Sequence, residues 1–127
     1  MGQYLIDTNI VSDYFTSSIS SSGMLFMSSV IDATPHLSII TQIELLCWKA
    51  EKNLEHKIAN FITDSIILDI DTEVVDFCVK IRKNKKIKTP DAIIAATALA
   101  NKYILITNNE NDFKNINGLK IINPHKL

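Results

Sequence analysis

The sequence predicts an α/β protein: a three-layer sandwich in which a central parallel sheet of four to five strands is flanked by helices. Short runs of aliphatic and β-branched residues alternate with longer segments whose apolar residues recur at helical spacing. Such alternation is typical of parallel strands joined by helical crossovers. The chain has 127 residues, 46% of them hydrophobic, which is enough for one core. No repeat or linker divides it, so we expect one domain over residues 1–127.

The first half of the chain supplies two of the expected strands. "YLI" runs straight into Asp7 and is typical of a short strand. A Ser-rich run at 16–23 is expected to be a loop, because serine side chains compete for the backbone hydrogen bonds of a helix. Pro35 is expected to end the helix that follows this loop. In order, we expect a strand at 4–6, a helix at 9–15, a loop at 16–23, a helix at 24–33, a strand at 36–40, and helices at 41–53 and 54–64.

The second half continues the alternation. "SIILDI" is rich in β-branched residues and predicts a strand, and "KTPDAIIAATALANK" predicts a helix with Thr89 as its N-cap and Pro90 at its first position. In order, we expect a strand at 65–70, helices at 71–85 and 88–102, a strand at 103–107, a polar turn at 108–113 and a last strand at 119–123.

Both cysteines lie in expected amphipathic helices. In the helix at 41–53, Ile43, Leu46 and Cys47 share one face, which we expect to pack on the core, and Cys78 lies on the apolar face of a later helix. Disulfide frameworks and zinc sites need more numerous or more closely set ligands. We therefore expect two reduced, partly buried thiols.

Several classes of protein are disfavoured by composition. The longest apolar stretch, Met24–Ala33, is too short and too polar to span a bilayer, and the N-terminus lacks the pattern of a signal peptide, so we expect a cytoplasmic protein without membrane contact. Three glycines leave no room for a Gly-rich phosphate loop. The histidines are scattered, and none pairs with a nucleophile at a recognisable spacing: His36, His56 and His125.

The positive charge is concentrated in one stretch. Formal net charge is −1, yet "KIRKNKKIK", Lys80–Lys88, holds six of the thirteen basic residues and no acid, which leaves seven basic against fourteen acidic residues elsewhere. One interpretation is a solvated helix end, where lysine and arginine favour the C-terminal dipole. The other is a surface that contacts a phosphate backbone.

Four carboxylates are expected at one edge of the sheet. Asp7 follows the first strand, Glu44 lies one turn into the helix after the second, Asp91 lies in the first turn after Pro90, and Asp112 follows "YILIT". In open parallel sheets the site lies beyond the carboxyl ends of the strands, where the strand order reverses. Acids that meet there repel one another and require cations. Oxygen-only ligands suit Mg²⁺ or Mn²⁺, which activate water and stabilise phosphoryl displacement.

Each acid also has a purely structural alternative. Asp7 can be a helix N-cap, Glu44 a surface residue, Asp91 a favourable charge at a helix N-terminus, and Asp112 a turn residue. "ILDIDTEV" resembles the aspartyl-phosphate loop of haloacid-dehalogenase-like phosphatases, but Glu73 stands where that pattern has Thr or Val. The remaining acids are expected on solvated faces, among them Asp13, Glu51, Glu55, Asp64, Glu73 and Asp76.

Four motifs in order, "YLIDTNI", "SIITQIELL", "TPDAIIAATALA" and "LITNNENDF", resemble the PIN-domain ribonucleases, and among them most closely the VapC-type toxins of bacterial toxin–antitoxin pairs. The resemblance covers nearly the whole chain and implies a PIN-like fold. It implies that Asp7, Glu44 and Asp91 bind the metal and that Asp112 is the fourth acid, which holds a second ion or a metal-bound water. It also implies a supporting set: Asn9, Thr107 and Asn109.

The same resemblance implies a substrate and partners. Family members use Mg²⁺ or Mn²⁺ to cut single-stranded or looped RNA, and VapC-type toxins usually cut tRNA or a ribosomal RNA loop as homodimers silenced by a small antitoxin. The basic stretch leads directly into Asp91, which makes part of it a candidate contact for the RNA backbone: Lys83, Lys85, Lys86 and Lys88.

The sequence departs from the family pattern in two regions. Cys47 and Trp48 stand where the family often has an aromatic-Gly step, and the Ser-rich run with "MLFM" after it is individual to this chain. Both regions are where RNA or antitoxin is expected to bind. Two other functions stay open at this point: a PIN nuclease of housekeeping RNA processing or of DNA flaps, and a non-catalytic PIN domain that binds RNA.

Overall fold

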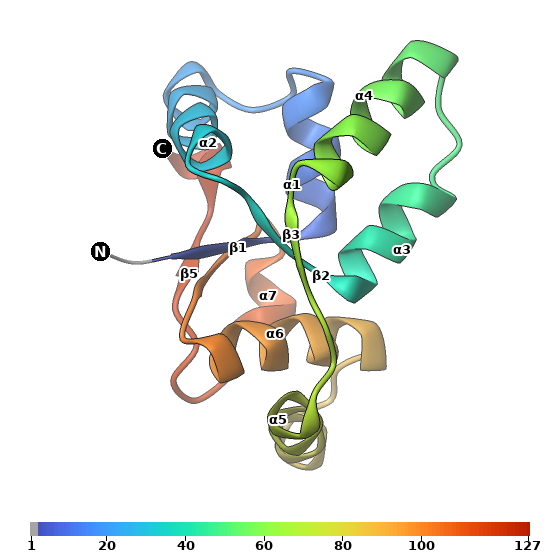
Figure 1. The fold of residues 1–127 in the computed structure, drawn as a ribbon. Coiled ribbons are helices and arrows are strands. Elements are labelled where there is room, and N and C mark those ends of the chain that lie inside the picture. Colours follow the sequence, from blue (N-terminus) through green and yellow to red (C-terminus); the bar gives the residue numbers. More distant parts are fainter. Residues whose placement is uncertain (1–2) are drawn as a thin grey trace.

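A parallel five-stranded sheet lies between two layers of helices in the computed structural model, which describes residues 3–127 (Figure 1). The strands are β1 (Tyr4–Ile6), β2 (His36–Ser38), β3 (Ile66–Leu68), β4 (Ile104–Ile106) and β5 (Ile121–Ile122). The helices are α1 (Thr8–Phe15), α2 (Ser21–Asp32), α3 (Ile39–Cys47), α4 (Lys52–Thr63), α5 (Thr72–Asn84), α6 (Thr89–Asn101) and α7 (Glu110–Phe113), followed by the 3₁₀ turn η1 (Pro124–Lys126). The expected three-layer α/β architecture is confirmed.

The order of the strands reverses beside β1. The sheet runs β3-β2-β1-β4-β5, and every neighbouring pair is parallel. From β1 the chain moves outward through β2 to β3, and then returns through α5 and α6 to β4 on the other side of β1. Leu5 pairs with Leu105 and Ile6 with Ile106 in the central register. The carboxyl ends of β1 and β4 therefore form the switch point at which α/β proteins place their sites.

The two faces of the sheet build two separate cores. Leu5 and Leu105 are fully buried in the core beneath α5 and α6, whereas Ile6 and Ile106, the next residues along, are buried in the core under α1 to α4. This is the period-2 alternation of a strand covered on both sides. Figure 1 shows the division, with α5 and α6 on one side of the sheet and α1, α2 and α4 on the other. Within residues 3–127, no helix has the length and apolar character needed to cross a membrane.

The expected face of the third helix is wrong. Thr41 and Leu45 are the buried residues of α3, while Ile43 and Leu46 are 52% and 60% exposed and Cys47 is exposed. The helix carries apolar residues almost all round, so spacing alone does not identify the face that packs on the sheet. Cys78 is half-buried, as expected, but Cys47 is a surface thiol.

Capping side chains shift two expected boundaries. The Ser38 hydroxyl accepts a hydrogen bond from the Ile40 amide at 3.0 Å, so β2 ends there and α3 begins two residues earlier than expected. The Ser20 hydroxyl accepts from the Gly23 amide at 3.2 Å, and α2 begins at Ser21. The expected Ser-rich loop is thus shorter, because its last serines start a helix.

Smaller differences occur at the other termini. The helix expected at 41–53 ends at Cys47, where Trp48 takes extended backbone angles. Thr89 is the first residue of α6 rather than its cap, and the N-cap position, Lys88, makes no side-chain capping hydrogen bond. The polar turn expected at 108–113 contains the short helix α7. The helix, strand and helix expected from 54 to 85 are confirmed: β3 and α5 are shorter than expected at both ends, and α4 begins two residues earlier, at Lys52.

Helix α2 packs closely against the C-terminal turn. Gly23 is buried, and a methyl group built on it would overlap the Pro124 carbonyl oxygen and the Ile19 side chain. The Ser20 hydroxyl also donates to the Leu127 carbonyl at 3.2 Å. A glycine at this position therefore permits the contact that joins the two segments.

We expect Gly23→Ala to destabilise the protein by about 1–3 kcal/mol, because the added methyl group must displace the backbone of η1. Urea unfolding followed by circular dichroism measures the change. Ser22→Ala, at an exposed neighbouring position of the same helix, is the control and is expected to change stability by less than about 0.5 kcal/mol. Equal stability of Gly23→Ala and Ser22→Ala would contradict the close contact.

Candidate active site

Asp7 lies at the carboxyl end of β1, beside the end of β4. Its amide donates to the Ile106 carbonyl at 2.9 Å, which extends the pairing of the two strands by one residue. Its carboxylate is nearly buried, with 5% of the residue exposed. Oδ1 accepts from the Thr8 amide at 2.8 Å, and Oδ2 accepts from the Thr107 hydroxyl at 2.8 Å. Asp7 is thus the N-cap of α1 and also a side chain fixed at the switch point.

Burial and neighbouring charge raise the pKa of Asp7 from 3.8 to about 6. Burial is the largest cause, and the charges of Asp91 and Glu44 raise the pKa further. The hydrogen bonds from Thr107 and Thr8 oppose this shift. Together these effects show that three carboxylates from separate parts of the sequence lie near enough to repel one another.

Glu44 is held by a threonine that sequence reasoning missed. The Thr8 hydroxyl donates to Glu44 Oε1 at 2.6 Å and lies 3.1 Å from the hydroxyl of the buried Thr41. Thr8 follows Asp7 directly, so its amide orients one acid and its hydroxyl orients another. The sequence signal that could have identified Thr8 was its position at a helix start, between Asp7 and Asn9. Its partner Glu44, 36 residues away, could be identified only from the fold.

Asp91 lies in the first turn of α6 and is half-buried. Burial raises the pKa of Asp91, and the charges of Asp112 and Glu44 raise it further, while Lys88 lowers it. The carboxylate therefore faces the other acids at the same edge of the sheet. Its position is also favourable for a helix N-terminus, so the structural alternative and the site role are compatible.

A chain of hydrogen bonds connects Asp7 to Asp112. The buried Thr107 hydroxyl donates to Asp7 and accepts from the Asn109 amide at 3.0 Å. The Asn109 side chain donates through Nδ2 to Asp112 Oδ2 at 2.7 Å. Asp112 itself is exposed, in the first turn of the short helix α7. The segment after β4 thus orients one buried and one exposed carboxylate.

The acids border an open, polar cleft of about 500 Å³. Asp7, Glu44 and Asp91 line it, together with Asn9 and Asn109. Asn9 is exposed, and Asp112 lies outside the lining. Further lining residues are Thr8, Ser12, Leu45, Cys47 and Trp48. The residues that depart from the family pattern, Cys47 and Trp48, therefore form part of the wall.

The candidate ligands have the chemistry that a hard divalent cation prefers, but they do not form a complete coordination site. Every candidate ligand is a carboxylate oxygen. Burial, and after it the charges of neighbouring acids, raise the pKa of Asp7 and of Asp91, while Lys88 is a positive group close enough to lower that of Asp91. In the part of the chain from Gln3 to Leu127, however, no three His, Cys, Asp or Glu side chains are placed to hold one ion together. Ligation by several acids would require side-chain movement in the less buried ones.

The basic stretch lies beside this edge without being part of the cleft. Lys83, Lys86 and Lys88 are exposed between the end of α5 and the start of α6, whereas Lys85 is half-buried and lines a different cavity. Lys88 is near enough to Asp91 to lower its pKa. Among the acids expected on solvated faces, Asp13 is the exception, because it is half-buried, and its Oδ2 lies 2.8 Å from Nε2 of His125.

We expect the metal-free protein to lose stability as the pH rises from about 4 to about 7. The pKa of Asp7 is raised on folding, so the folded state holds a proton that the unfolded state has released, and this stabilisation is present below pH 3.8 and lost through about pH 6. The shift corresponds to about 3 kcal/mol. Asp7→Asn removes the buried charge and should raise stability by about 1–3 kcal/mol at pH 8 in EDTA, measured by urea unfolding.

The comparison at pH 4 is the control for this prediction. There the Asp7 carboxyl is largely protonated in the folded protein, so the difference between wild type and Asp7→Asn should be small. A variant that is less stable than wild type by the same amount at pH 4 and pH 8 would show that ionised Asp7 carries no buried-charge penalty.

The chain matches the model of the PIN domain over residues 4–119. One similar solved structure is a toxin–antitoxin complex from Klebsiella pneumoniae, with 29% sequence identity and a TM-score of 0.75; the match covers 96% of this chain and 98% of that one. Another is VapBC2 from Rickettsia felis bound to a promoter DNA fragment, with 25% identity and a TM-score of 0.78; the match covers 94% of this chain and 97% of that one. DNA-bound VapBC from Salmonella typhimurium shares the fold, with 22% identity and a TM-score of 0.80; the match covers 98% of this chain and 99% of that one. No curated protein sequence gives a significant match. Because the family model spans nearly the whole chain, this protein belongs to the PIN domain family.

Proposed function

We propose that this chain, as a single domain over residues 1–127, is a Mg²⁺- or Mn²⁺-dependent endoribonuclease and the toxin of a VapC-type toxin–antitoxin pair. Its substrate is a tRNA or a ribosomal RNA loop in the cytoplasm, and the cut stops translation. The observation that carries the proposal is the buried Asp7 at the switch point, with Glu44 and Asp91 around one polar cleft. The likeness to chains of toxin–antitoxin complexes over nearly their full length supports the same role.

The residues that would hold the metal are Asp7, Glu44, Asp91 and Asp112. When bound, one or two divalent ions supply an activated water and neutralise charge on the scissile phosphate. Repulsion among the acids, which raises the pKa of Asp7 and of Asp91, supports this assignment because a cation removes it.

The protein's own contribution is to orient these acids. The Thr107 hydroxyl and the Thr8 amide fix both oxygens of Asp7, so this carboxylate cannot rotate. The Thr8 hydroxyl orients Glu44, and Asn109 orients Asp112. Lys88, near Asp91, is placed to attract a phosphate toward the cleft. No histidine lines the cleft, so acid–base chemistry by imidazole has no part in the proposal.

The antitoxin covers the exposed apolar face of α3. Ile43 and Leu46 are each more than half exposed, and Cys47 and Trp48 continue this surface into the cleft wall. Apolar surface that borders an acidic cleft suits a partner that packs on the helix and reaches the acids with a basic side chain. The protein is a homodimer in the proposal, as the VapC-type resemblance implies.

Asp7→Asn is expected to reduce metal-dependent RNA cleavage by about 100-fold or more, because it removes the most rigid ligand while keeping the side-chain shape. Cleavage of total RNA is measured with Mg²⁺, with Mn²⁺ and with EDTA, which should abolish it. Expression of the wild-type chain should arrest growth, and expression of Asp7→Asn should not.

Asp69→Asn is the matched control, since Asp69 is an exposed carboxylate outside the cleft. It should cleave at the wild-type rate. Undiminished cleavage by Asp7→Asn, or cleavage that persists in EDTA, would refute the metal site. Specific RNA binding without cleavage in any metal would instead favour the non-catalytic PIN domain.

Charge reversal of Lys83, Lys86 and Lys88 to glutamate should weaken RNA binding and lower the slope of log K against log salt by about two, since each phosphate contact on a single strand contributes about 0.7. Binding is measured by filter retention of a labelled RNA at several salt concentrations, in an Asp7→Asn background to prevent cleavage.

The control reverses the same number of exposed lysines elsewhere: Lys57, Lys102 and Lys120. Two of these precede β4 and β5, at the opposite edge of the sheet from the acids. If both triple variants weaken binding equally, the effect is one of net charge, and the basic stretch has no special part in RNA contact.

A further inference from the structure

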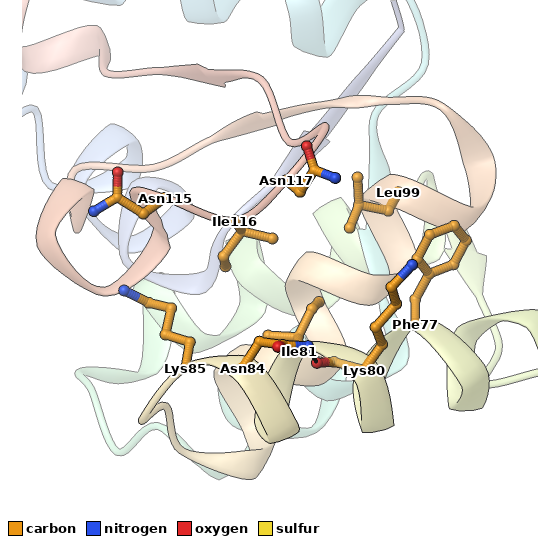
Figure 2. Close-up of a pocket in the computed structure, with 9 residues that line it drawn as sticks. All are labelled: Phe77, Lys80, Ile81, Asn84, Lys85, Leu99, Asn115, Ile116 and Asn117. Carbon is orange, nitrogen blue, oxygen red and sulfur yellow. Dashed lines mark hydrogen bonds between the residues drawn. The ribbon is translucent and has the colours of Figure 1, made fainter.

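A second cavity, of about 390 Å³, lies on the face of the molecule covered by α5 and α6 (Figure 2). It opens between α5, the C-terminal half of α6 and the segment from 114 to 120 that leads into β5. It shares no lining residue with the acidic cleft. Its volume is within the range of small-molecule sites in proteins.

The inner wall of the cavity is apolar. Ile81 and Ile116 are buried and form its floor, while Phe77 and Leu99 are half-buried and close one side. In Figure 2 the Leu99 and Phe77 side chains lie at one end of the opening, with Ile116 pointing toward α5. The half-buried ring of Phe77 is a surface on which a flat, apolar group can pack.

The rim of the cavity carries amides. Asn84 lies on α5, and Asn115 and Asn117 lie on the facing segment. Asn84 Nδ2 donates to the Lys80 carbonyl at 2.8 Å, which fixes that side chain. Asn115 and Gly118 have positive φ values of 64° and 83°, so this segment makes a tight turn opposite α5, with Asn115 and Asn117 at the rim of the cavity. Amides can pair with the mixed donor and acceptor edge of a heterocyclic ring.

Two lysines give the cavity a positive charge. Lys80, on α5, and Lys85, the residue after α5, extend toward the facing segment at opposite ends of the opening (Figure 2). No acidic residue lines the cavity, and in residues 3–127 the ion pairs are His125–Asp13 and Lys126–Glu110, so neither lysine is neutralised by one. Both belong to the basic stretch: Lys80 is exposed at the rim of the cavity, and Lys85 is half-buried.

We propose that this cavity binds one nucleotide, with its base against Phe77 and Leu99 at one end, its ring edge at the Asn amides, and its phosphate at Lys85 at the other end, while Lys80 adds positive charge beside the base. A cation would be repelled by the two lysines, and a neutral apolar ligand would make no use of their charge. An anion with a flat heterocyclic ring matches the apolar wall, the amides and the charge together. The nucleotide is either a free mononucleotide or an unpaired nucleotide of a bound RNA. The second source rests on the proposed function, since it places part of the substrate away from the acids.

Amide NMR spectra of the full chain in EDTA test the proposal with three probes: AMP, inorganic phosphate and a single-stranded hexanucleotide. We expect AMP or the hexanucleotide to shift the amide signals of Lys80, Lys85 and the residues from 115 to 117, more strongly than phosphate does. Lys80→Gln with Lys85→Gln should weaken that binding by about tenfold or more through loss of two charges. Phe77→Leu should weaken it by about fivefold through loss of stacking.

Lys52→Gln with Lys57→Gln, on α4 across the sheet, is the matched control and should bind as wild type does. Thermal unfolding of each variant shows whether it is folded, and for a Phe77→Leu variant that is not, Leu99→Met tests the same wall. Saturable shifts at the cavity with AMP identify a free nucleotide, and shifts with the hexanucleotide alone identify a strand.

Three results would overturn the proposal: no shift at the cavity with AMP or the hexanucleotide, equal binding of phosphate and AMP, or unchanged affinity in the double lysine variant. The outcome is separate from the proposed function, because binding is measured without metal and without cleavage. Loss of RNA cleavage in Asp7→Asn with no nucleotide at the cavity would uphold the nuclease and reject this site. Nucleotide binding in a chain that never cleaves RNA would do the reverse.

Discussion

Burial of the Asp7 carboxylate at the end of β1 is the constraint on which the rest of the site depends. An ionised carboxylate out of water is unfavourable unless hydrogen bonds and opposite charge compensate it. The fold supplies the Thr8 amide and the Thr107 hydroxyl, one to each oxygen. It supplies no cationic side chain there, and the charges of Asp91 and Glu44 increase the penalty. This environment lacks positive charge. Burial without a counter-charge raises the pKa of Asp7 and also favours the binding of the proposed metal ion.

The strand order explains how acids distant in sequence meet. Asp7 and Thr107 are 100 residues apart, yet they follow neighbouring strands, because the chain returns from β3 to place β4 beside β1. Glu44 and Asp91 arrive on helices that begin at the same edge of the sheet. The result is a gradient of rigidity: Asp7 is fixed on a strand end, and the exposed Glu44 and Asp112 are each oriented by a single hydrogen bond. Such a gradient suits a metal site in which one ligand is fixed beforehand and the others move to coordinate the ion.

Sequence reasoning predicted the parts of the fold that depend on local pattern. The alternation of strands and helices, the stop at Pro35 and the apolar face of α5 that carries Cys78 follow from periodicity and backbone chemistry, and the structure agrees with them. It failed where several local patterns compete. Ile43 and Leu46 have helical spacing, but α3 buries Thr41 and Leu45 instead, and only the packed sheet decides between the two faces. Asp7 and Asp112 were visible because a carboxylate after an apolar strand is unusual, and Glu44 and Asp91 because they lie near helix starts expected at the same edge of the sheet. Thr8 and Thr41 were not, because a hydroxyl between acids has meaning only when its partner's position in space is known.

The C-terminal segment supports the site from a distance. Helix α7 has four residues, too few to be stable by itself, and yet it carries Asp112. The Asn123 side chain and Lys126 both donate to Glu110 at the start of α7, and His125 pairs with Asp13 on α1. These are exposed or half-exposed contacts, and surface ion pairs add little to stability. Their importance is geometric: they join α1, whose N-cap is Asp7, and α7, which carries Asp112, to one short turn. That turn is held in its own place by Gly23 of α2, so the position of the outermost acid depends on a glycine contact on the other side of the sheet from Asp91.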